Sequence, residues 1–273
     1  MKMVSTLSAI LLFFSCVKAK DVSYTASTPA NDIVRSFFNI SNTDSIDFIR
    51  WNLSLLDDSF HLNCQYGISK PNTNGFIDGK TIHMNGAVKR EANKISIHHG
   101  HKILKLVELN SNLLLLVNEK DQAMVGNAGW SYTLNKLAGA KEESSLSVPV
   151  ISFTDSVKFE GRTPCNVPGI IAEGQECYKI KWQIVFFKTA GENSEGNYRI
   201  KGTPFRNYES KSGRWLLEKA QNGRRVYVLY NEKQQPFIHL LPIDNNVMVF
   251  TDSDIKLLVG NEDFSYTMNL VKW

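Results

Sequence analysis

The chain has 273 residues, of which 42% are hydrophobic and 11% are aromatic. This composition supplies enough apolar side chains for a packed core, so it excludes a disordered or fibrous chain. The 31 Lys and Arg residues nearly balance the 27 Asp and Glu residues, and the net charge of +4 includes no block of like charges. We therefore expect no nucleic-acid partner, and the length suggests two domains.

Residues 1–15 have the pattern of a secretory signal peptide. Lys2 is followed by an apolar stretch from Val4 to Phe14, and the segment contains no acidic residue. The stretch is shorter than the roughly 20 residues that a membrane-spanning helix requires. We therefore expect the chain to be exported.

The next residues predict a lipid anchor at Cys16. The sequence Phe-Phe-Ser-Cys over 13–16 resembles a relaxed bacterial lipobox, in which a small residue precedes the cysteine that is lipidated. Two alternatives are cleavage after Ala19 and a cysteine that only happens to lie in the apolar segment. Acyl chains on Cys16 would hold the protein at a membrane surface. The predicted location is the cell envelope, at the outer membrane.

The rest of the chain predicts an all-β protein with two tandem antiparallel β-barrels. Apolar runs of about five to eight residues alternate with clusters of Asn, Gly, Asp and Pro almost to the end of the chain. A flexible tether is expected before the first run, although Ile33–Phe38 within it could form a short helix or an added strand. The predicted segments are a tether over 16–44, a first barrel over 45–137, a linker over 138–154 and a second barrel over 155–273.

An internal repeat supports the duplication. Aligned without a gap at an offset of 134, the segments 112–135 and 246–269 are identical at eight of 24 positions. The offset is longer than the repeat of a solenoid or a propeller, so each copy is expected to be a whole domain. Each segment predicts a strand, a polar turn, a second strand around Met124–Asn127 or Leu258–Asn261, and a final strand.

The final strand of each copy carries candidate pocket residues. Strand alternation places Trp130 on the same side as Tyr132, and Phe264 and Tyr266 occupy the same positions in the second copy. These aromatic side chains are expected either to fill the barrel interior or to line a ligand pocket that opens at one end. Gly126 and Gly260 are expected to supply a bulge or a positive φ. (The two glycines occupy equivalent positions of the repeat.)

Two motifs in the second copy carry a family resemblance. The sequences Gly-Arg-Thr-Pro-Cys over 161–165 and Gly-Arg-Trp over 213–215, with the tandem β units, resemble the NlpE-like, copper-resistance-type lipoproteins of the Gram-negative envelope. The resemblance covers about 45–137 and 155–273. It implies small lipocalin-like or META-like barrels on a lipid tether, and a role in copper or envelope-stress sensing. The chain lacks the second cysteine of that family's Cys-x-x-Cys motif, so the copper role does not carry over directly.

Cysteine and histidine are the candidate chemical residues. In an oxidising compartment, the spacing of Cys165 and Cys177 favours a disulfide, which leaves Cys64 as a buried thiol or, alternatively, a ligand or a pairing partner. His99 and His101 would share one face of a strand, or would point outward if Gly100 forms a turn. Two imidazoles supply half of a copper or zinc site. No cofactor is otherwise expected.

The sequence contains no pattern typical of a catalytic site. A nucleophile elbow, a His-Glu-x-x-His motif, a phosphate-binding Gly loop and a dinucleotide fingerprint are all missing. The predicted function is therefore a non-enzymatic envelope lipoprotein that binds or senses a partner protein, a small ligand or a metal. Two alternatives are an enzyme with its site in an inter-domain cleft and a purely structural surface lipoprotein. An enzyme would show ionisable groups with displaced pKa values in that cleft.

Overall fold

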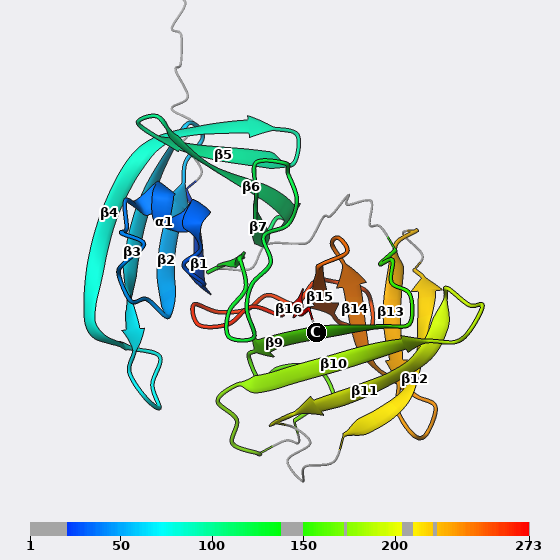
Figure 1. Ribbon diagram of the computed structural model, residues 1–273. Helices are drawn as coiled ribbons and strands as arrows, with labels where there is room; N and C mark the ends of the chain where they lie inside the picture. Colours follow the sequence, from blue (N-terminus) through cyan, green and yellow to red (C-terminus); the bar gives the residue numbers. More distant parts are fainter. Residues whose placement is uncertain (1–20, 138–149, 172–173, 204–209, 221–222, 273) are drawn as a thin grey trace, which may run out of the picture.

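The structure of the chain is a computed structural model that describes residues 21–137, 150–171, 174–203, 210–220 and 223–272. Its strands form two closed antiparallel barrels of eight strands each, which follow one another along the chain (Figure 1). The predicted all-β duplicated fold is confirmed. Within the described residues, no helix is long and apolar enough to cross a membrane.

The first barrel is closed by its N-terminal strand. This strand pairs with the second strand along its whole length and with the last strand through Tyr24 and Thr25. The strands are β1 (Val22–Thr28), β2 (Phe48–Leu55), β3 (Ser59–Ser69), β4 (Phe76–Glu91), β5 (Lys94–His99), β6 (Lys102–Asn110), β7 (Leu113–Val117) and β8 (Thr133–Lys136).

The start of this barrel corrects the predicted boundary, because 22–44 belong to the fold and not to a tether. The sequence of β1 is rich in Ser and Thr, which led to the prediction of a linker, yet Thr25 and Thr28 are buried. The Thr25 hydroxyl donates to the Trp51 carbonyl at 2.9 Å, and the Trp51 indole N–H donates to Thr28 Oγ1 at 2.8 Å. These bonds satisfy polar groups that would otherwise be costly to bury.

The short helix α1 (Asp32–Phe38) follows β1 and lies across the first barrel (Figure 1). Asn31 caps its N-terminus by accepting from the Val34 N–H at 3.0 Å, and Asn39 ends it in the left-handed conformation, at φ 60°. Val34, Phe37 and Phe38 are buried, and the Phe38 ring lies 4.8 Å from that of Trp51. The helix therefore adds apolar side chains to the barrel core. Of the two alternatives for 33–38, a short helix or an added strand, the helix is confirmed, although it belongs to the fold and not to a tether.

The second barrel repeats this order without a helix among its described residues. Its first strand pairs with its last through Glu160 and Asn269, which closes the barrel. The strands are β9 (Ser156–Thr163), β10 (Ile180–Lys188), β11 (Glu195–Gly202), β12 (Lys211–Lys219), β13 (Arg225–Tyr230), β14 (Pro236–Pro242), β15 (Val247–Thr251) and β16 (Thr267–Leu270).

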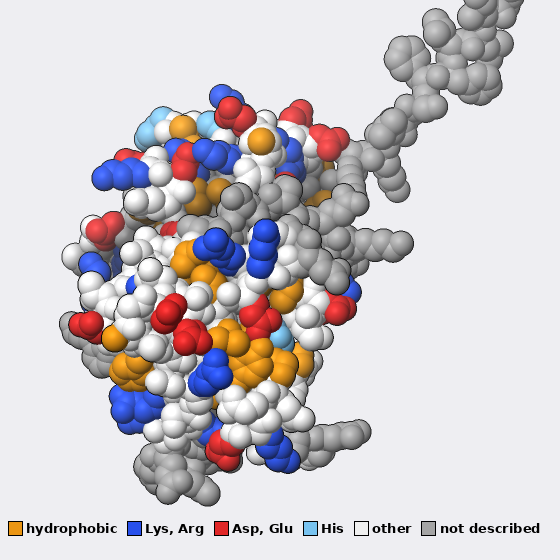
Figure 2. All heavy atoms as spheres, turned by 90° about the vertical axis from the view of Figure 1, so that its right-hand side faces the viewer, with side chains coloured by type: hydrophobic (Ala, Val, Ile, Leu, Met, Phe, Trp, Pro, Cys, Tyr) orange, Lys and Arg blue, Asp and Glu red, His pale blue; other side chains and the backbone are white. Residues whose placement is uncertain are grey.

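The strands β7 and β15 are buried on both faces, which explains their uninterrupted apolar sequences. In β15, Met248 and Phe250 belong to the core of the second barrel. Val247 and Val249, on the other face, belong to an apolar cluster that is continuous with the core of the first barrel. The two barrels are thus joined through the outer faces of these strands. On the face shown in Figure 2, hydrophobic side chains form small patches separated by charged ones.

Candidate functional site between the two barrels

The repeated segments of the two barrels meet each other at the inter-barrel interface. The Ser131 and Ser265 hydroxyls lie 2.5 Å apart, and those of Thr133 and Thr267 lie 2.9 Å apart. In each pair the two residues are one repeat length, 134 positions, apart. Residues that pair with their own repeat equivalents define an approximate twofold axis, as in an isologous dimer.

The same symmetry relates two amide contacts. The Gly260 N–H donates to Asn135 Oδ1 at 2.8 Å, and the Gly126 N–H donates to Asn269 Oδ1 at 2.7 Å. Neither glycine has a positive φ, which corrects that expectation. A Cβ at either position would lie 2.2 Å from a backbone carbonyl oxygen in the following turn. Glycine is required here by close approach of the backbone. The segments 124–127 and 258–261, which contain these glycines, are not strands, although strands were expected there. The nearest pairing is a single β-bridge just before each segment, at Ala123 in the first copy and Leu257 in the second.

The four predicted pocket residues divide into two groups. Tyr132 and Tyr266 are buried in the cores of the first and second barrels, respectively. Trp130 and Phe264 instead line a pocket between the barrels. Strand alternation failed for this second pair because the final strands begin only after Tyr132 and Tyr266. A tight turn before each strand, held by Asn127 or by its repeat equivalent, directs the aromatic side chain outward.

The pocket has a volume of about 140 Å³ and takes its walls from both barrels. This is small compared with the roughly 300–1,000 Å³ of a typical ligand site, so it suits a compact molecule. From the first barrel come β2, the β3–β4 loop and the turn before β8, and from the second barrel come the ends of β9 and β10 and the turn before β16. The lining residues are Phe48, Ser69, Lys70, Pro71, Asn72, Thr73, Asn74, Trp130, Arg162, Lys179, Asp263 and Phe264.

Stacked aromatic rings form the wall contributed by the first barrel. Phe48 lies between Phe76 and Trp130, with ring centroids 4.3 and 4.7 Å apart and interplanar angles of 26° and 17°. The Arg162 guanidinium of the second barrel lies over the outer ring of this stack, 5.4 Å from the Trp130 centroid. The stack therefore presents a flat apolar surface with a cation at its end.

The carboxylate of the pocket, Asp263, is already fully engaged. Arg50 donates to its Oδ1 at 2.5 Å, and the Asn74 amide donates to its Oδ2 at 2.5 Å. Arg50 also donates to the Asn74 carbonyl at 2.6 Å. These bonds cross from one barrel to the other and fix the β3–β4 loop against the turn before β16. Asp263 is therefore neutralised by Arg50.

The lining holds three further cations, of which Lys70 is exposed and the other two, Arg162 and Lys179, are partly buried without such a partner. Within the described parts of the chain, no carboxylate lies within ion-pair distance of Arg162 or Lys179. The Lys179 ammonium instead lies 5.5 Å from the Phe264 centroid and 5.2 Å from the Tyr178 centroid. The pocket thus holds two cations over aromatic rings, with no carboxylate bound to either.

The surroundings of these cations disfavour their charged forms. Burial lowers the pKa of the Arg162 guanidinium. Burial also lowers the pKa of the Lys179 amine, as do the charges of Arg162 and Lys181, while Asp263 acts in the opposite direction. An anion in the pocket would offset the repulsion between Lys179 and Arg162, so the electrostatics favour a negatively charged ligand.

A disulfide ties together the segments that carry the two cations. Cys165 and Cys177 are joined, with their Cα atoms 5.9 Å apart. Arg162 lies three residues before this bond on β9, and Lys179 lies two residues after it, immediately before β10. Because Arg162 also pairs with Lys181 across the two strands, the position of Lys179 relative to Arg162 is set by both the ladder and the disulfide.

The other predicted site residues lie away from this pocket. Cys16 lies outside the described residues. His99 ends β5, where its Nδ1 lies 2.7 Å from the Asn85 carbonyl oxygen, and His101 is exposed in the following turn. Nowhere in the described ranges do three or more His, Cys, Asp or Glu side chains group in a way that could hold a metal. Cys64 is a free buried thiol, and burial raises its pKa, which makes it a poor ligand or nucleophile.

No family model, curated protein or solved structure matches the chain.

Sequence reasoning missed Arg162 and Lys179 as site residues. Arg162 was noted only as part of the motif over 161–165, and Lys179 carries no motif at all. A signal did exist, because Arg162 and Lys179 flank the two cysteines that predicted the disulfide. The part that no sequence pattern could supply is the approach of Trp130 from the other barrel.

Proposed function

We propose that this chain is a non-enzymatic envelope lipoprotein that binds a small organic anion in the pocket between its barrels. The observation that supports this function is the pair of partly buried cations, Arg162 and Lys179, that have no carboxylate partner in the described chain. A guanidinium offers paired donors that match a carboxylate or phosphate group. The adjacent Trp130 ring provides a surface for a flat or apolar part of the same ligand.

The location of the protein is part of the proposal. Lipidation of Cys16 would tether the barrels to the outer membrane, as the lipobox-like sequence and the resemblance to NlpE-like lipoproteins imply. On this proposal, ligand binding between the barrels is the event that the protein senses. Replacement of Cys16 with Ser should move the protein from the membrane fraction to the soluble fraction of an expressing Gram-negative host. Retention of the variant in the membrane would contradict the lipid anchor.

The ligand class is tested by calorimetric titration of the full chain with benzoate, inorganic phosphate and neutral benzyl alcohol. We expect benzoate to bind, and benzyl alcohol, which has the same ring without the charge, not to bind. Arg162→Ser should weaken benzoate binding by about tenfold or more, since hydrogen bonds to charged groups contribute about 1.5–3 kcal/mol. Serine is the residue that the first barrel carries at the equivalent position, Ser27.

Two controls make this titration specific. Arg225→Ser removes an exposed cation at the start of β13 and should leave benzoate binding unchanged. Lys179→Met keeps most of the aliphatic chain and should weaken binding in the same way as Arg162→Ser. Equal binding of benzoate by the wild type and both pocket variants would rule out the pocket as the anion site. Binding of phosphate but not of benzoate would support an anion site and exclude the aromatic part of the proposed ligand.

A second candidate, an enzyme with its site between the barrels, has one observation in its favour. The lowered pKa of the Lys179 amine increases the fraction of the neutral form, which can act as a nucleophile or a base. Mass spectrometry of benzoate esters incubated with the protein would detect turnover. Product formation that Lys179→Met abolishes would favour the enzyme over the binding protein.

A further inference from the structure

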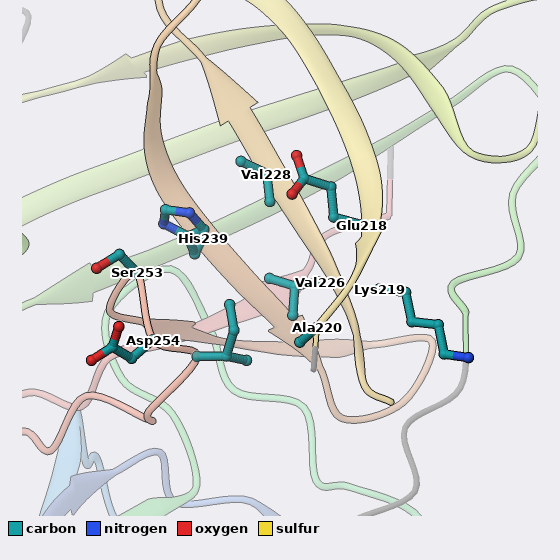
Figure 3. Close-up of a pocket in the computed structure, with 9 residues that line it drawn as sticks. Glu218, Lys219, Ala220, Val226, Val228, His239, Ser253 and Asp254 are labelled. Atoms are coloured by element: carbon teal, nitrogen blue, oxygen red, sulfur yellow. The ribbon is translucent and has the colours of Figure 1, made fainter. Parts of the chain in front are cut away.

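A second hollow, of about 520 Å³, lies against the outer face of the second barrel (Figure 3). Its floor includes Val226 and Val228 of β13, whose neighbours Tyr227 and Leu229 point the other way into the barrel core. The remaining walls come from β12, β14 and the loop after β15. The lining residues are Glu218, Lys219, Ala220, Val226, Val228, His239, Ser253, Asp254 and Ile255.

The first barrel has a hollow at the equivalent place. In the second barrel, Tyr227 pairs with Leu240, and in the first barrel Ile95 pairs with Leu106, which is the repeat equivalent of Leu240. This register makes β13 the counterpart of β5 and β14 the counterpart of β6. The hollow of the first barrel, formed by β4, β5 and β6, measures about 240 Å³. Five equivalent pairs line the two hollows, and three of them hold the charge cluster of the first barrel: Lys94 and Val226, Lys105 and His239, and Asp121 and Ile255.

Lysine side chains line the hollow of the first barrel. Lys94 donates to Asp121 Oδ2 at 2.5 Å, and Lys105 donates to Asp121 Oδ1 at 3.0 Å. Two aliphatic chains that end in ammonium groups thus converge on one carboxylate. These ion pairs are exposed, so they contribute little to stability. They do show that an aliphatic chain ending in an ammonium group fits this surface.

In the second barrel all three residues of this charge cluster are replaced, but the carboxylate of Glu218 lines the hollow. Glu218 is paired with Val226 on the neighbouring strand, just as Glu91 is paired with Lys94 in the first barrel. The Tyr230 hydroxyl donates to Glu218 Oε1. Among the described residues, Glu218 Oε2 makes no hydrogen bond. One carboxylate oxygen is therefore available at the edge of an apolar floor.

The imidazole of His239 offers a second acceptor. In Figure 3, Glu218 and His239 both flank the side chains of Val226 and Val228, whereas the Lys219 ammonium points away from them. No hydrogen bond joins the His239 ring to another part of the described chain. Burial lowers the pKa of His239, with Glu218 and Asp252 opposing the shift, so the neutral ring is the form present at pH 7. A neutral imidazole has one ring nitrogen that can accept a hydrogen bond.

We propose that this hollow binds an alkylammonium group, an aliphatic chain that ends in a protonated amine. The aliphatic chain would lie against Ala220 and Ile255, which are partly exposed, with the buried Val226 and Val228 beneath it. The ammonium would donate to Glu218 Oε2 and to the free nitrogen of His239. The group would take the place that Lys94 and Lys105 occupy in the first barrel. A lysine side chain of a partner protein and a free amine share this chemistry.

The test is a titration of the full chain with n-pentylammonium, followed through the imidazole and valine methyl resonances of the hollow. Saturable shifts should appear with n-pentylammonium and not with n-pentanol, which has a similar chain without the charge. Glu218→Gln should weaken binding by about tenfold or more. Glu91→Gln, the matched change in the first barrel, should leave binding unchanged.

A rebuilt cluster provides an independent variant. The triple substitution Val226→Lys, His239→Lys and Ile255→Asp should rebuild the ammonium–carboxylate cluster of the first barrel, place protein ammonium groups where the ligand would bind, and abolish binding. If this variant does not fold, Glu218→Gln decides the question. The absence of saturable shifts with n-pentylammonium, equal binding of n-pentanol, or equal affinities for Glu218→Gln and Glu91→Gln would overturn the proposal.

The source of the amine is resolved by a second titrant, the capped peptide Ala-Ala-Lys-Ala-Ala. Tighter binding of this peptide than of n-pentylammonium would support a lysine side chain of a partner protein. Binding of n-pentylammonium with no binding of the peptide would support a free amine. Norleucine in place of the peptide's lysine should abolish binding, and undiminished binding of that peptide would also overturn the proposal.

Discussion

The residues on the approximate twofold axis determine how closely the barrels approach. Serine and threonine hydroxyls bond to their repeat equivalents across the axis, and two glycines donate backbone N–H groups to asparagine side chains. Small side chains permit these contacts. The Asn135 side-chain nitrogen donates to the Asn261 carbonyl at 3.0 Å, whereas its equivalent, Asn269 Nδ2, is buried without a hydrogen-bond partner in the described chain. The eight identities of the repeat are therefore concentrated where the two copies touch, in addition to the core tyrosines.

A methyl group added at Gly126 tests this close approach. Its Cβ would lie 2.2 Å from the Trp130 carbonyl oxygen, so the turn must shift. Gly126→Ala should lower the free energy of unfolding by about 1–3 kcal/mol, as other overpacked sites do. Urea denaturation measures this loss. Gly75→Ala is the control, because its nearest neighbour would be 3.5 Å away, and a similar loss there would contradict the argument.

His239 predicts a pH dependence of stability. Its pKa is lowered in the folded state from an unfolded value of 6.5 by burial, so below that value the unfolded chain binds more protons than the folded one. Stability should therefore fall as pH decreases through 6.5 toward the lowered folded pKa. His239→Asn should make the profile flatter over this range. Urea denaturation of both proteins from pH 7.5 to pH 5 measures the difference, and parallel profiles would refute it.

At the scale of elements, the repeat aligned the segments from β7 to β8 and from β15 to β16, because no insertion separates the copies there, but the strands expected at 124–127 and 258–261 were wrong. Other equivalences lie at different offsets. Trp51 and Trp182 donate to Thr28 and Thr163 in the same way, at 2.8 and 2.9 Å. The tryptophans are 182 − 51 = 131 positions apart and the threonines 163 − 28 = 135. Insertions and deletions thus concealed β1 from an alignment without gaps.

The position of β1 makes a direct prediction about truncation. A chain that starts at residue 45 lacks the strand that pairs with β2 and β8, so the barrel would have two unpaired edges. In such a chain the NMR resonances of the first barrel should not be dispersed, whereas they should be dispersed in a chain that starts at residue 21. A folded first barrel in the shorter chain would show that β1 is dispensable.

The disulfide between Cys165 and Cys177 is expected to stabilise the second barrel and the anion pocket together. Closing a loop of this length contributes about 3 kcal/mol through the entropy of the unfolded chain. The double substitution of both cysteines with Ser should therefore lower the unfolding free energy by about this amount and weaken benzoate binding. Calorimetry measures both effects. A stable variant with normal benzoate binding would separate the disulfide from the pocket.

At the scale of the whole molecule, the chain resembles a homodimer whose two subunits have become one polypeptide. The sequence predicted the duplication and the barrels, but it did not predict that the copies contact each other through the repeated segment itself. That arrangement depends on the outward faces of β7 and β15. Their apolar sequences do not distinguish a residue in the barrel interior from one in the contact between the barrels. The candidate pocket follows from the arrangement, because its walls come from both barrels.

The symmetry predicts the behaviour of an isolated barrel. The fragment 21–137 retains the outer face of β7 and the residues on the twofold axis, so a second copy can replace the missing barrel. Sedimentation velocity should show this fragment as a dimer that dissociates on dilution, while the full chain stays monomeric. Leu115→Asp should prevent the dimerisation. A fragment that is monomeric at all concentrations would contradict the isologous contact.

Fusion of the two barrels into one chain changes the way their contact depends on abundance. Separate subunits associate in proportion to their number, so a scarce protein would lose its interface and the pocket between the subunits. Covalent connection gives each barrel a fixed local concentration of its counterpart. It also frees each copy to vary alone, so that one hollow can keep its lysine cluster while the other becomes open. A single molecule would then carry a complete pocket and two unlike outer faces.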